Sequence, residues 1–154
     1  MDIQIERLGP GAEVAALQAA RRLKSLQERN GREPSLPHLE RFLAQDTNYL
    51  ILAADGDSPV GFLTAYRVPD YFSDGMMVYL FEIEVLPAYR RQGIAKRMVQ
   101  RLIDLCVADG VEDIWVGTEN DNVAAKRLYA STGGMLESPD LCEFVYDLTA
   151  FPRG

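Results

Sequence analysis

The stretch from residue 78 to residue 108 most constrains how this chain can fold, because it places a basic turn between an apolar strand and a helix. Residues 78–85 are largely apolar, and residues 94–108 repeat apolar side chains at helical spacing. The first N–H groups of a helix lack partners within it and, with the helix dipole, favour an anion. Gly93 allows close approach of the backbone to a ligand. The turn therefore predicts a site for a phosphate-bearing cofactor, although a basic loop that only caps a helix is an alternative. The residues of the predicted site are Arg90, Arg91, Gln92, Gly93, Ile94, Ala95 and Lys96.

The other apolar runs predict alternating strands and helices in one mixed α/β domain that spans residues 1–154. Strands are expected at residues 3–8, 49–54, 60–68, 78–85 and 114–117, with one or two more between residues 135 and 148. Helices are expected at residues 14–26, 94–108 and 122–131, and Ser35 is expected to cap a further short helix. Residues 55–59 predict a hairpin loop of several residues. The order strand, helix, strand over residues 78–117 implies a parallel pair.

Composition restricts the classes of function. The chain has 154 residues, a net charge of -7 and 47% hydrophobic residues. Its acidity argues against nucleic acid as a partner and suits a cationic substrate, although solubility alone also accounts for it. No apolar run approaches about 18 residues, so no membrane segment is expected. The N-terminus lacks a signal-peptide pattern and Cys106 and Cys142 lack metal spacing, which predicts free thiols and a cytoplasmic location. His38, the single histidine, is expected at the surface.

A second motif follows the predicted fifth strand: Asn122-x-x-Ala125-x-x-x-Tyr129-x-x-x-Gly133. Ala125 and Tyr129 are four residues apart, so they lie on one face of a helix. This motif, together with Arg90-x-x-Gly93-x-Ala95 after a strand, resembles the Gcn5-related N-acetyltransferases. That resemblance implies a mixed, mostly antiparallel sheet of about six or seven strands with a parallel central pair, flanked by about four helices.

The resemblance also implies acetyl-CoA as co-substrate, no metal and a homodimer. The pantetheine arm is then expected between the fourth and fifth strands, held by the backbone near Ile83 and Val85 and by Asn122. Ala125 leaves room for the ligand. Tyr129 would protonate the departing thiolate, whereas the alternative is a core tyrosine with a satisfied hydroxyl group.

Several segments narrow the resemblance to the aminoglycoside 3-N-acetyltransferases. They are residues 48–54, 60–69, 79–85 and 90–95. Two departures concern the acceptor side: Glu84 stands where those enzymes usually have alanine, and residues 118–122 replace a run of aspartates. Glu119 and Asp121 retain acidic character there and are the candidate substrate-binding residues.

Glu82 and Glu84 alternate along the predicted fourth strand and share one face. Tyr79, Phe81, Ile83 and Val85 are expected on the other face. Carboxylates within a covered strand are costly unless they are solvated, paired or used in chemistry. Glu82 aligns with an aspartate of the aminoglycoside enzymes and is the preferred general base, with Glu84 second. The alternative is a solvated or ion-paired face.

The sequence therefore favours an acetyl-CoA-dependent N-acetyltransferase that modifies the 3-amino group of an aminoglycoside by direct transfer in a ternary complex. A protein or peptide amine, or a small metabolite amine, is the second hypothesis for the acceptor. A non-catalytic acyl-CoA-binding module is the third hypothesis, against which Tyr129 and the paired glutamates argue, since binding alone needs neither.

Overall fold

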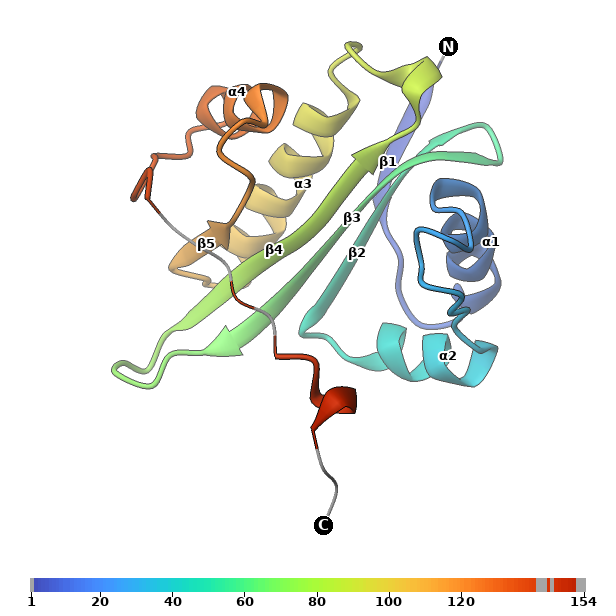
Figure 1. Ribbon diagram of the computed structural model, residues 1–154, viewed down its shortest axis with the longest axis horizontal. Helices are drawn as coiled ribbons and strands as arrows, with labels where there is room; N and C mark the ends of the chain where they lie inside the picture. The colour runs from blue at the N-terminus through green and yellow to red at the C-terminus, as the bar shows by residue number, and fades with distance from the viewer. Residues whose placement is uncertain (1, 141–143, 145, 152–154) are drawn as a thin grey trace.

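The computed structural model describes residues 2–140, 144 and 146–151, and its centre is a five-stranded sheet in the order β1-β2-β3-β4-β5 (Figure 1). The strands are β1 (Ile3–Arg7), β2 (Asn48–Asp55), β3 (Ser58–Pro69), β4 (Met76–Val85) and β5 (Asp113–Val116). The first four strands pair antiparallel, and β5 runs parallel to β4. The predicted α/β fold and its parallel pair are confirmed.

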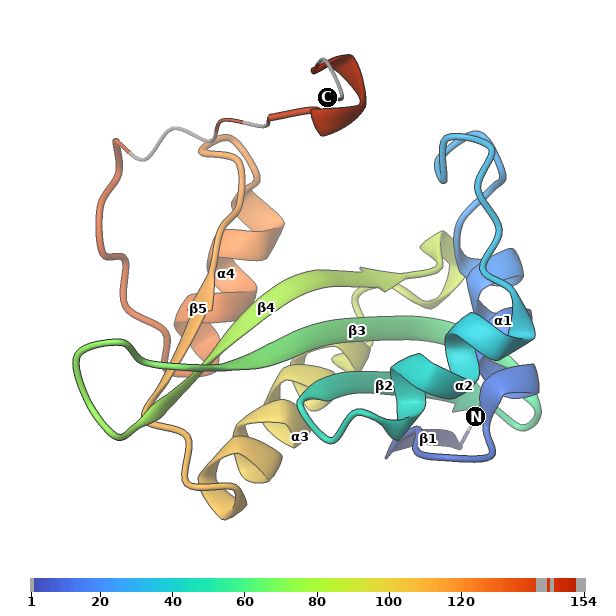
Figure 2. The same cartoon turned by 90° about the horizontal axis from the view of Figure 1, so that it is seen from below.

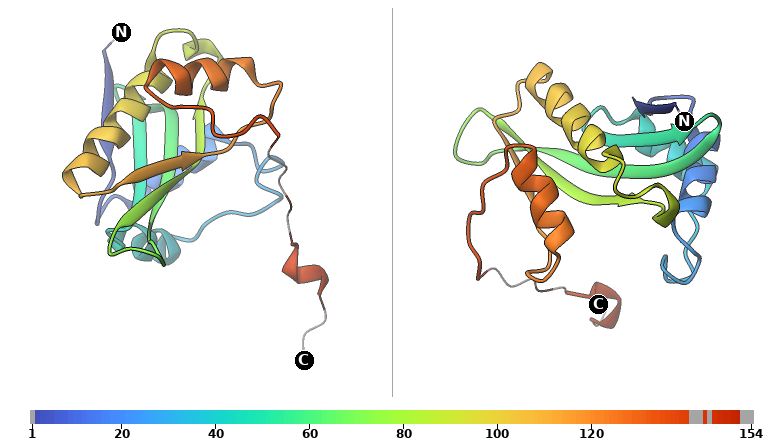
Figure 3. Two further views of the ribbon diagram at one scale, coloured as in Figure 1. Left: turned by 90° about the vertical axis from the view of Figure 1, so that its left-hand side faces the viewer. Right: turned by 90° about the horizontal axis from the view of Figure 1, so that it is seen from above.

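Helices cover both faces of the sheet (Figure 1). They are α1 (Glu13–Leu23), α2 (Leu36–Ala44), α3 (Ile94–Ala108) and α4 (Val123–Ser131). Alternating side chains of β2 divide the core: Leu50 and Leu52 pack with α1 and α2, whereas Tyr49 and Ile51 pack with α3. α3 and α4 lie on the same side of the sheet (Figure 3). Within the described residues, no helix is both long and apolar enough to cross a membrane.

The predicted helix starts are largely correct. At the start of α2 the Ser35 hydroxyl accepts a hydrogen bond from the His38 N–H over 3.2 Å, and His38 is exposed as predicted. α3 spans residues 94–108, and Gly110 follows it with a φ of 74°. That left-handed conformation is the usual one just beyond a helix C-terminus.

Two predicted boundaries are wrong. α1 ends at Leu23 rather than at residue 26, because Lys24 has an extended backbone with φ -134° and ψ 131°. The hairpin between β2 and β3 is shorter than expected, since Asp55 pairs with Ser58 and only Gly56 and Asp57 remain unpaired. The φ of 59° at Gly56 suits a tight turn of this length.

β4 contains a bulge. Thr64 pairs with Glu82 and Ala65 pairs with Leu80, so Phe81 is an extra residue without a partner on β3. A bulge of this kind interrupts the alternation of side chains between the two faces of a strand.

This bulge overturns the expectation that Tyr79 and Phe81 share a face with Ile83 and Val85. Ile83 and Val85 pack in the α3 core. The ring of Phe81 instead contacts the rings of Tyr66 and Tyr79 on the opposite face. Aromatic rings and the two β4 carboxylates therefore lie along one side of the sheet.

The final strands predicted between residues 135 and 148 are not observed among the described residues, which have five strands rather than six or seven. Residues 135–140 contain two adjacent apolar side chains followed by Glu137, Ser138, Pro139 and Asp140. That order favours a turn and lacks the alternation of a strand. Within the rest of the predicted segment, residues 141–143 and 145 lie outside the described residues. Cys142 is one of them. Cys106 is a free, buried thiol.

Candidate active site

The turn between β4 and α3 presents the start of a helix to open space. Gly93 is the N-cap of α3, with no side-chain cap and no acidic residue in the first turn. The first main-chain bond of this helix runs from the Arg97 N–H to the Gly93 carbonyl over 3.0 Å. Gly93 has a φ of 76°, Arg91 a φ of 62°, and a Cβ added at Gly93 would meet no atom within 4 Å. The N–H groups of the first turn therefore face an accessible site that suits a phosphate.

Side chains of the turn anchor it to the sheet. The Tyr89 hydroxyl donates to the Asp55 carboxylate over 3.0 Å, which joins the turn to the β2–β3 hairpin. The Arg90 Nε donates to the Val85 carbonyl over 3.0 Å. Backbone groups near Ile83 and Val85 were expected to hold the pantetheine arm, and in this structure the Val85 carbonyl bonds Arg90. Arg91, Gln92 and Lys96 are exposed around the turn.

β4 and β5 separate beside this turn. Their pairing ends at Leu80 and Val116, while β4 continues to Val85 (Figure 2). Residues 82–85 therefore pair with β3 on one side and leave their other edge without a strand partner in the described part of the chain. Exposed main-chain groups on such an edge can bind an extended ligand. The backbone near Ile83 lies in this separated section, as expected.

The second motif begins α4. The Asn122 Oδ1 accepts a hydrogen bond from the Ala125 N–H over 3.0 Å, so Asn122 is the N-cap. Ala125 and Tyr129 are both half-buried. Burial raises the pKa of Tyr129, and the nearby Tyr79 adds to the effect. The hydroxyl group of Tyr129 thus remains protonated at neutral pH, which a proton donor requires.

The predicted general bases lie together and share a cation that the sequence did not indicate. The Lys24 Nζ lies 2.5 Å from a carboxylate oxygen of Glu82. Burial raises the pKa of Glu84. The charge of Lys24 lowers this pKa, and the neighbouring charges of Glu28 and Glu82 raise it further. A carboxylate with a raised pKa is a better proton acceptor near neutral pH.

The loop between β5 and α4 carries the two candidate substrate-binding residues. Glu119 and Asp121 are exposed on it. The charges that act on Glu84 come instead from Lys24, Glu28, Glu82 and Arg90. The structure thus brings Glu82 and Glu84 together with the end of α1.

Two hollows lie beside β4, and the separated section lines one of them. One, of about 430 Å³, lies between the end of α1, the following loop and the β4–α3 turn, with Glu28, Glu84 and Arg90 in its lining. The other, of about 350 Å³, lies between α3, α4 and β5, with Tyr129 and Cys106 in its lining. Burial raises the pKa of Cys106 to about 11, so this thiol is a poor nucleophile.

Comparisons with known proteins identify the class. Residues 16–134 match the acetyltransferase (GNAT) family, so the chain belongs to this family. The resemblance inferred from the two motifs is confirmed. Membership of the family also gives the class of enzyme, since its members are N-acetyltransferases that use acetyl-CoA.

A crystal structure of an aminoglycoside acetyltransferase, meta-AAC0020, from an uncultured soil metagenomic sample has a similar fold. The form in complex with trehalose has a TM-score of 0.85 and 27% identity, covering 95% of this chain and 96% of that chain. The form in complex with sisomicin has a TM-score of 0.82 and 26% identity over the same shares.

A curated relative gives a different acceptor. The [ribosomal protein bS18]-alanine N-acetyltransferase of Escherichia coli (strain K12) is 41% identical over 54 residues, which are 35% of this chain and 36% of that protein. The match thus spans about a third of the length of this relative.

Proposed function

We propose that this chain transfers the acetyl group of acetyl-CoA directly to the 3-amino group of an aminoglycoside in a ternary complex. The observation that carries the proposal is the pair Glu82 and Glu84, which lie on one face of β4 where β5 has separated from it. Two carboxylates beside a cofactor channel attract a polycation and accept its proton. The similarity to meta-AAC0020 over nearly the whole chain supports the same class of acceptor.

The turn at Gly93 fits the cofactor, because open space lies before the unpartnered N–H groups of α3. In the proposed complex, these groups, with Arg91, Gln92 and Lys96, hold the pyrophosphate. The backbone near Ile83 and the side chain of Asn122 hold the pantetheine arm. Acetyl-CoA supplies a thioester whose carbonyl carbon is open to attack by an amine.

Side chains and backbone groups of this chain then transfer protons and stabilise the developing charge. Glu82, or Glu84 in its place, takes a proton from the acceptor ammonium, directly or through one water. A backbone N–H of residues 81–85 donates to the developing oxyanion. Tyr129 donates its proton to the departing thiolate. Holding both substrates in one cleft removes much of the entropic cost of their encounter.

A peptide amine is the second candidate acceptor. It rests on the 54-residue match to the ribosomal protein alanine acetyltransferase, which covers only part of each chain. A peptide N-terminus carries one ammonium group, so it would use the carboxylate pair less fully than an aminoglycoside with several.

The test measures release of free CoA by the purified protein with panels of aminoglycosides, polyamines and peptides. We expect turnover with sisomicin or gentamicin, a product acetylated at the 3-amino group by NMR, and a KM that rises with salt. Glu82→Gln and Glu84→Gln should each reduce kcat/KM, and Glu40→Gln, an exposed position on α2, is the matched control. Turnover of a peptide but of no aminoglycoside would overturn the acceptor assignment.

A further inference from the structure

The side chain of Lys24 leaves the end of α1 and reaches the candidate general base. Its Nζ contacts Glu82 at 2.5 Å, although the two residues are 58 positions apart in the sequence. Lys24 is the first residue after α1, and its extended backbone directs the chain away from the helix axis. The ion pair therefore depends on where α1 ends.

The loop that follows α1 fixes the backbone of Lys24 but not its ammonium group. The Arg29 guanidinium donates to the Lys24 carbonyl over 3.1 Å and to the Arg32 carbonyl over 2.6 Å. Ser25 and Glu28 exchange hydrogen bonds of 2.6 and 3.1 Å within the same loop. The stem of a lysine remains flexible beyond a fixed backbone, and its ammonium group is a mobile point charge.

The ammonium group of Lys24 remains charged at neutral pH. Burial lowers its pKa, but the hydrogen bond to Glu82 and the charges of Glu82, Glu84 and Glu28 outweigh burial and raise it. The pair is also open to solvent, with 27% of the Lys24 side chain and 35% of the Glu82 side chain exposed. Ion pairs with this exposure contribute little to stability, so another cation can replace Lys24 at low cost.

We propose that Lys24 is an internal competitor for the acceptor: its ammonium group occupies Glu82 in the free enzyme, and a cationic acceptor must displace it to bind. This inference rests on the proposed function and goes beyond it, because it assigns a specificity role to the loop after α1. Displacement leaves the Lys24 charge nearby, where it repels a second ammonium group unless that group reaches another carboxylate. Glu84 and Glu28 supply such carboxylates, so the arrangement favours acceptors with several spaced ammonium groups over monoamines.

The test compares acceptor binding by Lys24→Met and wild type, with calorimetry of sisomicin binding in the presence of CoA so that no turnover occurs. Methionine keeps an unbranched stem and removes the charge. We expect about 3- to 10-fold tighter binding, corresponding to loss of one partly exposed competing pair. Lys24→Arg retains a cation and should bind like wild type, and Arg101→Met, an exposed change of the same charge on α3, is the matched control. KM for sisomicin should fall in the same proportion.

A double-mutant cycle separates competition from a merely structural role. In a Glu82→Gln background, Lys24→Met should alter sisomicin affinity less than it does in wild type, because the competing pair is already broken and only the charge of Lys24 remains. Lys24→Gln, checked for its melting temperature, provides a second neutral variant should Lys24→Met fold poorly. Unchanged or weaker sisomicin binding by the neutral variants would overturn the inference.

Spermine, tested in the same calorimetric format, distinguishes failure of this inference from failure of the proposed function. If wild type does not bind sisomicin but the neutral variants bind spermine more tightly than wild type does, the competitor role stands and the acceptor assignment fails. If wild type acetylates sisomicin and the neutral variants show wild-type affinity and KM, the function stands and the competitor role fails.

Discussion

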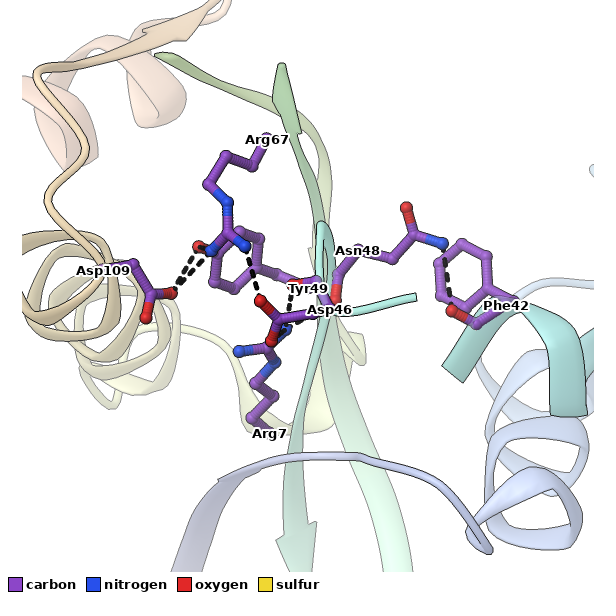
Figure 4. Close-up of polar contacts among 7 residues, drawn as sticks. All are labelled: Arg7, Phe42, Asp46, Asn48, Tyr49, Arg67 and Asp109. Carbon is purple, nitrogen blue, oxygen red and sulfur yellow. Dashed lines mark hydrogen bonds and ion pairs between the residues drawn. The ribbon is translucent and has the colours of Figure 1, made fainter. Parts of the chain in front are cut away.

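The two ends of the sheet both carry clusters of charged side chains, but the balance of charge differs between them. At the end where α3 terminates, the Arg67 guanidinium bonds Asp46 over 2.6 Å, Asp109 over 2.9 Å and the Tyr49 hydroxyl over 2.8 Å (Figure 4). Arg7 lies 4.3 Å above the ring of Tyr49. Tyr49 is fully buried, and Arg67 lowers the pKa of Asp46.

At the other end, where α3 begins, the charges are not matched in this way. The carboxylates of Glu82, Glu84 and Glu28 lie around Lys24, and Arg90 also acts on Glu84. The first turn of α3 has neither a side-chain cap nor an acidic residue. One end is thus a network in which opposite charges satisfy each other, and the other has a hollow lined by charges of both signs next to unused N–H donors. Satisfied networks stabilise a fold, whereas unmatched groups in a cleft suit a ligand.

The comparison predicts that changes at the α3 start remove function and leave the fold intact. The largest expected effect is that of Gly93→Glu, which places a carboxylate where phosphate is expected and should weaken acetyl-CoA binding by more than about 100-fold, as measured by calorimetry. Gly93→Asn is the matched control, because asparagine tolerates the left-handed conformation without adding charge. A folded Gly93→Glu variant that binds acetyl-CoA with wild-type affinity would contradict the proposal of a phosphate site at this end.

Tyr129→Phe tests whether this end of the sheet also carries the chemical step. The ring stays in place and the hydroxyl group is lost, so kcat should fall roughly 10- to 1,000-fold while acetyl-CoA affinity changes little. Tyr71→Phe, on the β3–β4 loop where the side chain is 89% exposed, should behave as wild type. Steady-state kinetics decide the outcome, and full activity of Tyr129→Phe would make it a core tyrosine.

The difference between the two ends also explains what the sequence could predict. The phosphate turn is local: its glycine, its basic residues and the following helix are adjacent in the chain, so α3 and its start were predicted to the residue. The start of α4, predicted at residue 122 and observed at Val123, is local in the same way.

Contacts between distant segments gave no such signal. Lys24 looked like one more polar residue of a longer helix, and its contact with Glu82 depends on α1 ending early. The bulge at Phe81 is defined by pairing with β3, so the alternation of β4 alone predicted the wrong faces. Arg67 and Asp109 lie 42 residues apart and belong to no motif.

Changes at the end of the sheet where α3 terminates should have the opposite result: the protein should lose stability and keep its activity. Arg67→Met removes the cation shared by Asp46, Tyr49 and Asp109, so the free energy of unfolding should fall by about 2–4 kcal/mol. Arg41→Met, an exposed arginine on α2, should stay within about 0.5 kcal/mol of wild type. Urea titration measures both. A kcat/KM per folded molecule that fell 100-fold in Arg67→Met would contradict the division between the ends.

The smallest expected effect concerns Tyr49→Phe, because Arg67 and Asp109 stay bonded to each other at 2.9 Å without the hydroxyl group. At neutral pH we expect a loss of about 1 kcal/mol. Burial, with the hydrogen bond to Asp109, raises the pKa of Tyr49 to about 12, against an ordinary value of 10.0. Between these two values the unfolded chain releases the proton first, so the folded state binds more protons and wild-type stability falls as pH rises. The variant lacks this contribution, and the gap between the two proteins should narrow across the same interval. The Tyr49 hydroxyl group also lowers the pKa of Cys106, so both groups contribute to the change in this gap. Urea titrations from pH 8 to pH 12 provide the measurement, and a constant gap would show that the hydroxyl proton is held no more tightly in the fold than in the unfolded chain.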